Sequence, residues 1–432
     1  MIGRTRMGAW GVETTAARLA DIHGALLCGL HGLAAWIAAV PELETKIAWS
    51  YHLYDLAAGA DAVARRIHGL TAERPEVPTP HNQALWPFFH ALLDLETTEE
   101  QIAGLYGVLL SAVLESCQEH LARTNPVADE PTIRVLYPLS EALESMVIWS
   151  SKQKVDDATV NRLQLDLTEA GGLHGGLTQT PAGKPLLPNP TTYAGEQQFR
   201  PRLVAVPARD VRFIPIEPDK KFPKAKPLTT PEGRIRLLHI ALINLEIPAI
   251  EVCGRMIAEF PESPWAMKLE LAHQIWDEAR HAVMCADRLQ ALGGTIGQFP
   301  YHHRVWEHSL EGANLAERFI TTQRIHEGNG IDQTLLARDA LAEVGDFESS
   351  QVMDYILADE VLHVRSGNTW LERLTSGPEE RAALLQGVEE RLGISAAKGG
   401  PPLNREGRQK AGFTDVELDW LASFRPQPKG RE

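Results

Sequence analysis

The sequence has few of the features that mark secreted or membrane proteins. Its four cysteines form no Cys-x-x-Cys pair and are too few for a disulfide framework, so a reducing compartment is expected. No uninterrupted apolar run approaches the roughly 18 residues of a membrane span, and the N-terminus lacks a signal-peptide core. The sequence therefore predicts a cytoplasmic protein that does not associate with membranes.

A surplus of positive charge is also missing. The net charge of −15 at pH 7 argues against broad nucleic-acid binding, because such binding depends on neutralising phosphates. One basic stretch, 200–226, is interrupted by Asp210, Glu217 and Asp219. We interpret it as a partly charge-balanced linker.

One pattern occurs twice in the second half of the chain. A lone glutamate is followed, after the length of a helical hairpin, by a Glu-x-x-His pair. On a helix, residues i and i+3 share one face, so the Glu and the His of a pair can bind one ion. Two such halves packed face to face supply the carboxylates and imidazoles of the ferritin-like di-iron and di-manganese proteins. The predicted ligands are Glu246, Glu278, His281, Glu327, Glu360 and His363.

The residues beside the two Glu-x-x-His pairs fit the same site. The copies read Asp-Glu-Ala-Arg-His (277–281) and Asp-Glu-Val-Leu-His (359–363). Ligating histidines usually donate their second N–H to a carboxylate, so Asp277 and Asp359 are expected to orient the imidazoles across the bundle, with Arg280 paired to one of them. The first copy resembles the Asp-Glu-x-Arg-His helices of bacterial di-iron oxygenases. The second departs from that pattern by having Leu362 in place of the arginine.

A further resemblance covers about residues 230–375. It rests on Arg-Ile-His-Glu-Gly-Asn-Gly-Ile-Asp (324–332), Gly-Asp-Phe-Glu-Ser (345–349) and Asp-Glu-Val-Leu-His-Val (359–364). These stretches resemble a bacterial ferritin-like family of largely unassigned function, related in fold to tRNA-modifying di-iron hydroxylases. The resemblance implies a ferritin-like four-helix bundle and the same six ligands, and it supplies no substrate.

Two acidic residues compete with the chosen ligands. The pair Glu270-Leu-Ala-His273 lies two turns before the first Glu-x-x-His and about 80° around the helix, so we interpret it as a chance match. Glu251 lies about 140° around the helix from Glu246, and the matching spacing of the two halves favours Glu246. Pro248 removes a backbone donor, which predicts a kink or π-bulge beside this ligand.

Other residues near the ligands have two interpretations. His239 either supports the metal ligands or is a buried structural histidine. At Gly328 and Gly330 either the helix ends, or the missing side chains leave room beside the metals for dioxygen or substrate. Tyr355 is a candidate redox tyrosine. The residues expected in the pocket wall are Cys253, Gln274, Cys285, Gln323, Met353 and Ile356.

Periodicity and composition divide the chain into four parts. Residues 1–155 read as a helical domain whose two hairpins would form a degenerate bundle, and 156–232 as a Pro- and Gly-rich strap whose short apolar pieces suggest either an ordered strap or a small hairpin. Residues 233–395 contain the metal bundle, and 396–432 an extended tail. The expected fold is all-α. The helices expected in the first domain span 13–40, 42–70, 99–122 and 133–154.

The ligand chemistry suits Fe(II) or Mn(II), because carboxylates and imidazoles favour these ions over thiolate-preferring metals. We therefore expect a non-haem di-iron oxygenase or oxidase, with Mn or mixed Mn/Fe as variants, that uses dioxygen on a small molecule, peptide or nucleoside. Since no Gly-x-Gly-x-x-Gly motif is present, a ferredoxin or flavin reductase is expected to supply electrons. The alternatives are a ferroxidase or metal-handling protein, and a scaffold that uses metal only for stability. A monomer or homodimer is expected.

Overall fold

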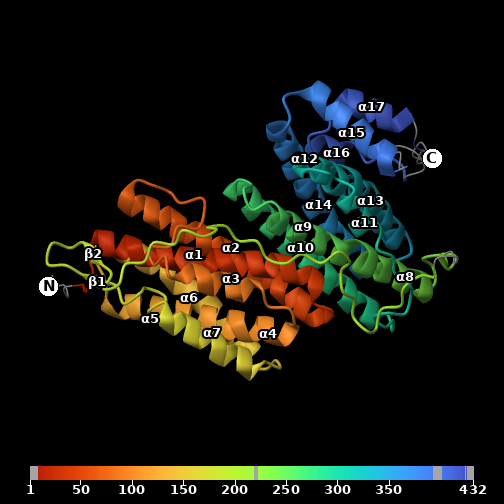
Figure 1. Cartoon of the computed structure of the whole chain (residues 1–432). Coiled ribbons are helices and arrows are strands. Elements are labelled where there is room, and N and C mark those ends of the chain that lie inside the picture. The colour runs from red at the N-terminus through yellow and green to blue at the C-terminus, as the bar shows by residue number, and fades with distance from the viewer. Residues whose placement is uncertain (1–7, 218–221, 393–400, 424, 426–432) are drawn as a thin grey trace, which may run out of the picture. The chain divides into compact units, whose positions relative to one another are not determined.

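The computed structural model describes residues 8–217, 222–392, 401–423 and 425. This part of the chain is helical apart from one antiparallel hairpin, β1 (Thr178–Gln179) and β2 (Pro185–Leu186), and one isolated bridge (Figure 1). The all-α prediction is confirmed. The chain forms two compact units: unit 1 is Met1–Val40, Ala48–Val206 and Ile257–Ala272, and unit 2 is Pro41–Ile47, Pro207–Met256 and His273–Glu432.

Unit 1 is built around a long, almost fully buried helix. The structure has a helix at each of the four predicted positions, and it has a further helix, α3, within the stretch 72–91 that its prolines marked as a break. Gly29 of α1 allows close packing, since a Cβ there would lie 3.0 Å from Leu56 and 3.1 Å from Leu105. The helices in sequence order are α1 (Val12–Ala39), α2 (Leu43–Thr71), α3 (Leu85–Leu93), α4 (Thr98–Ile102), the π-helix η1 (Ala103–Leu110), α5 (Ser111–Arg123), α6 (Glu130–Ser150) and α7 (Asp157–Glu169).

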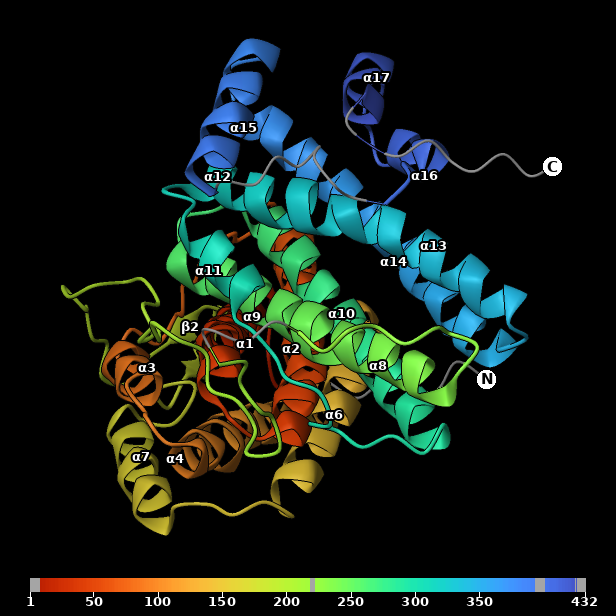
Figure 2. The same ribbon diagram turned by 90° about the vertical axis from the view of Figure 1, so that its right-hand side faces the viewer.

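Unit 2 repeats one arrangement. A helix interrupted by a π-helical turn is followed by a long straight helix, first as α8-η2-α9 with α10 and then as α12-η3-α13 with α14 (Figure 2). Borders between the two units fall within α2, α9 and α10 and in the strap after Val206. The elements are α8 (Pro231–Ala241), η2 (Leu242–Glu246), α9 (Ile247–Glu259), α10 (Trp265–Ala291), α11 (Arg304–Leu310), α12 (Leu315–Phe319), η3 (Ile320–Glu327), α13 (Gly328–Glu343), α14 (Phe347–Leu374), α15 (Pro378–Leu392), α16 (Arg405–Lys410) and α17 (Asp415–Ser423).

Side chains with capping chemistry fix where these helices begin. Thr230 accepts a hydrogen bond from the Gly233 amide at the start of α8, and proline follows at the first helical position. Asp346 accepts from the Ser349 amide at 3.1 Å and so starts α14, which contains the second Glu-x-x-His pair. The starts of α8 and α14 are thus set by local hydrogen bonds.

The predicted extended tail is wrong for the residues that the structure describes. Residues 405–410 and 415–423 form α16 and α17, and Phe413 and Leu418 are buried in an apolar cluster with Ile331 and Val364. The Gly-, Pro- and Lys-rich composition of this region concealed a short amphipathic pattern. Burial of a few apolar side chains against α13 and α14 stabilises helices that are too short to persist alone.

The Pro-rich strap is ordered in its described part. Its hairpin forms at 178–186 and not in the apolar pieces at 203–214, where the chain instead approaches Tyr301 through a parallel bridge from Pro215. Charge balance in the basic stretch is borne out for Arg209, which pairs with Glu251, and for Arg212, which pairs with Asp210. Lys220 and Lys221 lie outside the described residues.

Two helical stretches have the length and apolar composition of a membrane span, contrary to the expectation from the sequence. They are Val12–Ala39 and Pro231–Glu259. In their most apolar windows, 94% and 83% of the residues are buried within the protein. Core helices of soluble proteins have the same composition and burial.

Candidate metal centre

Two π-helical turns place the lone glutamates of the repeat. η2 ends at Glu246 and η3 ends at Glu327. The π-bulge predicted beside Glu246 is confirmed, and the equivalent turn at Glu327 was not foreseen because no proline marks it. A π-turn holds an extra residue, so it rotates the following side chains relative to a regular helix. Both halves therefore use the same local distortion at the same position in the repeat.

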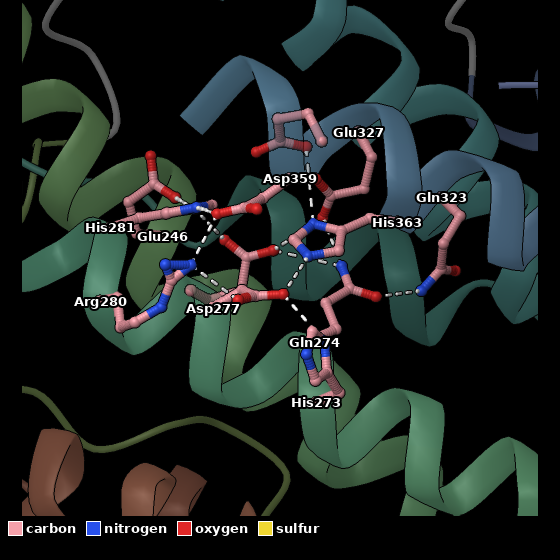
Figure 3. A network of polar contacts seen from close by, with 12 residues as sticks. Glu246, His273, Gln274, Asp277, Arg280, His281, Gln323, Glu327, Asp359 and His363 are labelled. Atoms are coloured by element: carbon pink, nitrogen blue, oxygen red, sulfur yellow. Dashed lines mark hydrogen bonds and ion pairs between the residues drawn. The ribbon is translucent and has the colours of Figure 1, made fainter. Parts of the chain in front are cut away.

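The six predicted ligands converge between four helical segments of unit 2 (Figure 3). They form two groups whose ligand atoms all lie within 4.8 Å of one another. Two glutamates, Glu278 and Glu360, belong to both groups, as expected of carboxylates that bridge two ions. The first group is Glu246, Glu278, His281 and Glu360, and the second is Glu278, Glu327, Glu360 and His363.

Burial of four carboxylates in one place dominates the electrostatics. None of the six side chains exposes more than 7% of its surface. Burial raises the pKa of Glu246 to about 8 and, together with the neighbouring Glu327, raises the pKa of Glu360 well above its ordinary value. Burial also opposes ionisation of Glu278, but the positive charge of His363 outweighs it and lowers the pKa of this carboxyl. The site therefore favours cations strongly, since two divalent ions would balance all four carboxylates.

The aspartates beside the ligands cross over between the two halves. The His281 Nε2 lies 3.0 Å from Asp359 Oδ2, and the His363 Nε2 lies 3.2 Å from Asp277 Oδ2. Arg280, expected to bind one aspartate, donates to both, at 2.8 Å to Asp277 and 2.7 Å to Asp359. Each imidazole thus presents Nε2 to a carboxylate, which leaves Nδ1 directed at the glutamates. One arginine holds the aspartates of both halves, so the second copy does not need an arginine of its own.

Polar atoms in the centre lack hydrogen-bond partners of correct geometry. Glu360 Oε2 and His363 Nδ1 are buried and make no such bond to any described residue, although the His363 Nδ1 lies 3.1 Å from Glu278 Oε1. Gln274 donates to Glu278 and to Glu327, at 3.2 Å each, and in turn accepts from Gln323 at 3.1 Å. Buried oxygen and nitrogen atoms that lack hydrogen-bond partners can instead bind metal ions. Their position beside the hydrogen-bonded amides of Gln274 and Gln323 therefore fits a metal site.

The two glycines after Glu327 do not end the helix, because α13 begins at Gly328 and runs on to Glu343. A Cβ at Gly330 would lie 3.3 Å from Glu360 Oε2 and 3.4 Å from its carboxyl carbon. The first interpretation, that the helix ends here, is therefore wrong. The absence of a side chain at Gly330 allows the Glu360 carboxylate to approach closely, and room for dioxygen or substrate stays a prediction.

The structure decides between the two interpretations of His239. This residue is buried and accepts hydrogen bonds from the amides of Gly297 and Phe299, at 2.9 and 3.4 Å, so it is a structural histidine that holds a loop and does not support a ligand. The prediction for Tyr355 is wrong, because its 60% exposure places it away from the buried centre and removes it as a redox tyrosine. Helical phase alone does not reveal which segment packs on a given face.

The rival acidic and histidine residues have other partners. Glu251 is fully buried and forms ion pairs with Lys46 and Arg209, so it lies outside both ligand groups. His273 also lies outside them, but its Nδ1 is 3.0 Å from Asp277 Oδ2. It therefore contacts a residue that orients His363, a link that the sequence did not indicate.

The expected wall residues are buried, as a pocket or an ordinary core requires. Cys253, Cys285, Met353 and Ile356 expose no more than 3% of their surfaces. Burial raises the pKa of both thiols well above the ordinary value, with contributions from Glu327 and Glu278 at Cys253 and from Glu246 at Cys285. The thiols thus lie near the carboxylates but stay protonated, so they are not ligands of the thiolate type.

Comparison with known proteins adds a family and one relative. A family model described as "Protein of unknown function (DUF455)" matches residues 183–419, which include all six candidate ligands and α16. An uncharacterized protein of Haemophilus influenzae is 29% identical over 229 residues, covering 50% of this chain and 78% of the relative. No solved structure matches. Because the family match spans more than half of the sequence, the chain belongs to the DUF455 family.

Proposed function

We propose that unit 2 binds two iron ions, with manganese or a mixed pair as variants, and acts as a non-haem oxygenase or oxidase. The observation that carries this proposal is the pair of overlapping ligand groups, each with three carboxylates and one imidazole, that share Glu278 and Glu360. Such a ligand set favours Fe(II) or Mn(II). The bundle and its ligand pattern also resemble ferritin-like di-metal proteins.

The surrounding residues support redox chemistry by holding the ligands in place. Asp277 and Asp359 fix the ring orientation of the two histidines, and Arg280 holds both aspartates. A bound di-iron pair would supply dioxygen activation, which no amino-acid side chain provides. Burial of all six ligands excludes bulk water and so protects a reactive oxidant from side reactions.

The remaining expectations stay part of the proposal. Dioxygen would be the co-substrate, and the organic substrate would be a small molecule, a peptide or a nucleoside. Electrons would come from a separate ferredoxin or flavin reductase. Four buried, unpaired cysteines suit a reducing cytoplasm. We expect a monomer or homodimer, with no role for nucleic acid or membranes.

Metal loading followed by dioxygen consumption tests the proposal. The chain is loaded anaerobically with Fe(II), freed of excess metal and analysed for iron. We expect about two irons per chain, the number that bridged carboxylate pairs hold. Stopped-flow mixing with dioxygen should then show one oxidation of the bound iron and no continued uptake until reductant is added. The matched control is Glu348→Gln, an exposed glutamate on the same helix as Glu360.

The same experiment separates the alternative of a ferroxidase or iron store. Such a protein would oxidise many irons per chain and assemble as a closed shell, which light scattering after size-exclusion chromatography detects. A shell that loads hundreds of irons would replace the oxygenase proposal. Failure of the anaerobically loaded chain to retain iron or manganese would overturn the di-metal site itself.

A further inference from the structure

A second cluster of reactive side chains lies in unit 1, apart from the metal ligands. Ser116 of α5 has its Oγ 2.5 Å from the Nε2 of His174, which follows α7. The Nδ1 of the same ring lies 3.0 Å from Oδ2 of Asp21 on α1. The imidazole thus has a hydroxyl at one nitrogen and a carboxylate at the other. This is the order of groups in Ser-His-Asp hydrolases, which is recognised by geometry and not by sequence position.

Hydrogen bonds from Asn82 hold this cluster in place. Asp21 is fully buried, and its Oδ1 accepts a hydrogen bond of 2.7 Å from the Asn82 amide. The Asn82 side chain donates to the carbonyls of Ala170 and Gly172, at 3.0 and 3.1 Å, in the loop that bears His174. One asparagine therefore fixes both the carboxylate and the loop. A group that orients the base is the third requirement for an activated serine.

Glycines shape this loop around the asparagine. Gly171 and Gly175 have φ of +77° and +59°, in the left-handed region that side chains disfavour. A Cβ at Gly175 would lie 3.0 Å from the Asn82 side chain. The sequence Ala-Gly-Gly-Leu-His-Gly-Gly (170–176) is thus needed to bring His174 to Ser116, which gives a physical role to a motif outside the metal bundle.

The protonation state of the imidazole suits a base. Burial, with a contribution from the charge of Arg18, lowers the pKa of His174 well below its ordinary value. His120 and His81 act in the same direction, and Glu119 opposes them. At neutral pH the ring is therefore neutral. Burial also raises the pKa of Asp21 to about 7, so the triad requires the ionised form of this carboxyl, to which Nδ1–H is donated while the Nε2 lone pair accepts the hydroxyl proton of Ser116.

Ser116 and His174 open onto a cavity of about 820 Å³ in unit 1. Its wall also includes Gly172, Gln164, Glu115 and Glu119. Among the described residues that line it, the charged ones are Glu115 and Glu119, and Glu119 is paired with Arg18 and Arg123. The charge of Glu115 therefore disfavours a substrate that carries a carboxylate or phosphate. The cavity suits a neutral or cationic molecule.

The wall of the cavity also contains candidate oxyanion donors. Leu173 and His174 line the cavity, and among the described residues no backbone acceptor is found for their amide N–H groups. Acyl transfer needs such donors, because negative charge develops on the carbonyl oxygen in the transition state. These two amides are the donors that we assign to a carbonyl bound at Ser116.

We propose that Ser116, His174 and Asp21 form a catalytic triad that hydrolyses small neutral or cationic esters. Ser116 Oγ bonds to the carbonyl carbon as its proton passes to His174 Nε2, and the ester C–O bond then breaks as the leaving alkoxide takes that proton. Water, deprotonated by the same nitrogen, cleaves the acyl-serine and releases the acid and the free hydroxyl. No oxidant or reductant takes part. All three residues precede the part of the chain that the family model matches, so the activity would be separate from that of the metal centre.

Covalent labelling of the full chain tests this site. The protein is treated with a fluorophosphonate probe, digested and analysed by mass spectrometry, and p-nitrophenyl acetate hydrolysis is measured in parallel. We expect one adduct, on Ser116, and at least about a hundredfold loss of hydrolysis in Ser116→Ala and His174→Gln, the scale of general-base catalysis. The matched control is Ser111→Ala, because Ser111 lies on the same helix and the same cavity wall but donates to the Tyr106 carbonyl.

Two further measurements keep the outcome decisive. Circular dichroism and thermal melting show whether each variant folds. The wild-type chain freed of metal by dialysis against a chelator should retain the full esterase rate, which excludes hydrolysis by a metal-bound hydroxide. Absence of an adduct on wild-type Ser116 would overturn the triad, as would equal hydrolysis by wild type and a folded Ser116→Ala variant.

Discussion

The crossed aspartates allow a prediction for each half of the metal centre. Asp359 accepts from His281 and Arg280 and is 21% exposed at its side chain, whereas Asp277 accepts from His363 and Arg280 and is only 3% exposed. Replacing either by asparagine keeps the shape but removes the charge that orients an imidazole. Loss of a carboxylate behind a metal-binding histidine costs about 10–100-fold in metal affinity, or about 1.4–2.7 kcal/mol.

Replacing the more buried aspartate should reduce the free energy of metal binding more, since its charge is screened less by water. We expect Asp277→Asn to weaken the ion beside His363 by about a hundredfold and Asp359→Asn to weaken the ion beside His281 by about tenfold. Anaerobic Mn(II) titration followed by calorimetry measures both steps. Asp354→Asn, an exposed aspartate on the same helix as Asp359, is the control and should bind as wild type does. Unchanged affinity in both buried variants would refute the assigned role of the aspartates.

Three further predictions concern residues around the centre and in unit 1. His281→Ala should lose metal, while His273→Ala should retain it, as elemental analysis after dialysis will show; loss of both ions from the His273 variant would mean that it is a ligand. Gly330→Ala should lower metal affinity without unfolding the chain, because its methyl group would press on the carboxylate of Glu360; calorimetry showing wild-type affinity would count against this. Asp129 has a lowered pKa because hydrogen bonds from an imidazole, two hydroxyls and an arginine outweigh the effect of burial, so Asp129→Asn should destabilise unit 1 at pH 7 by about 1–3 kcal/mol. Stability from a depressed carboxyl pKa is present above the unfolded value and lost as pH falls below it, so the difference in melting temperature should shrink below about pH 4, and a constant gap would contradict the assignment.

The six candidate ligands could be predicted from the sequence because the geometry of each Glu-x-x-His pair is local. Glu278 and His281 share a helix face through three residues of spacing, and the same holds for Glu360 and His363. The repeat of this spacing after Glu246 and Glu327 then identified both halves. Composition and 3.6-residue periodicity were likewise sufficient for the all-α fold and for most long helices.

Features that depend on contacts between distant segments could not be predicted from the sequence. The sequence proposed Asp277 and Asp359 as partners of histidines but could not show that each serves the other half. The role of His239 stayed open between two interpretations, because the loop at 297–299 that contacts it comes from elsewhere in the chain. The helical tail was missed because burial of Phe413 is a property of the packed unit and not of its own segment.

The cluster in unit 1 shows the same limit more strongly. Asp21, Ser116 and His174 come from three separated segments, and no spacing rule connects them. The glycine-rich sequence at 170–176 was the sole local signal, and glycine alone marks a turn and not a catalytic base.

Anomalous diffraction from crystals of the Mn(II)-loaded chain tests the central claim most directly. The account predicts two peaks about 3.5–4 Å apart, the spacing of ions bridged by carboxylates, with Glu278 and Glu360 in contact with both and one histidine on each. A map with no peak between these residues, or with a single ion held by other side chains, would contradict it.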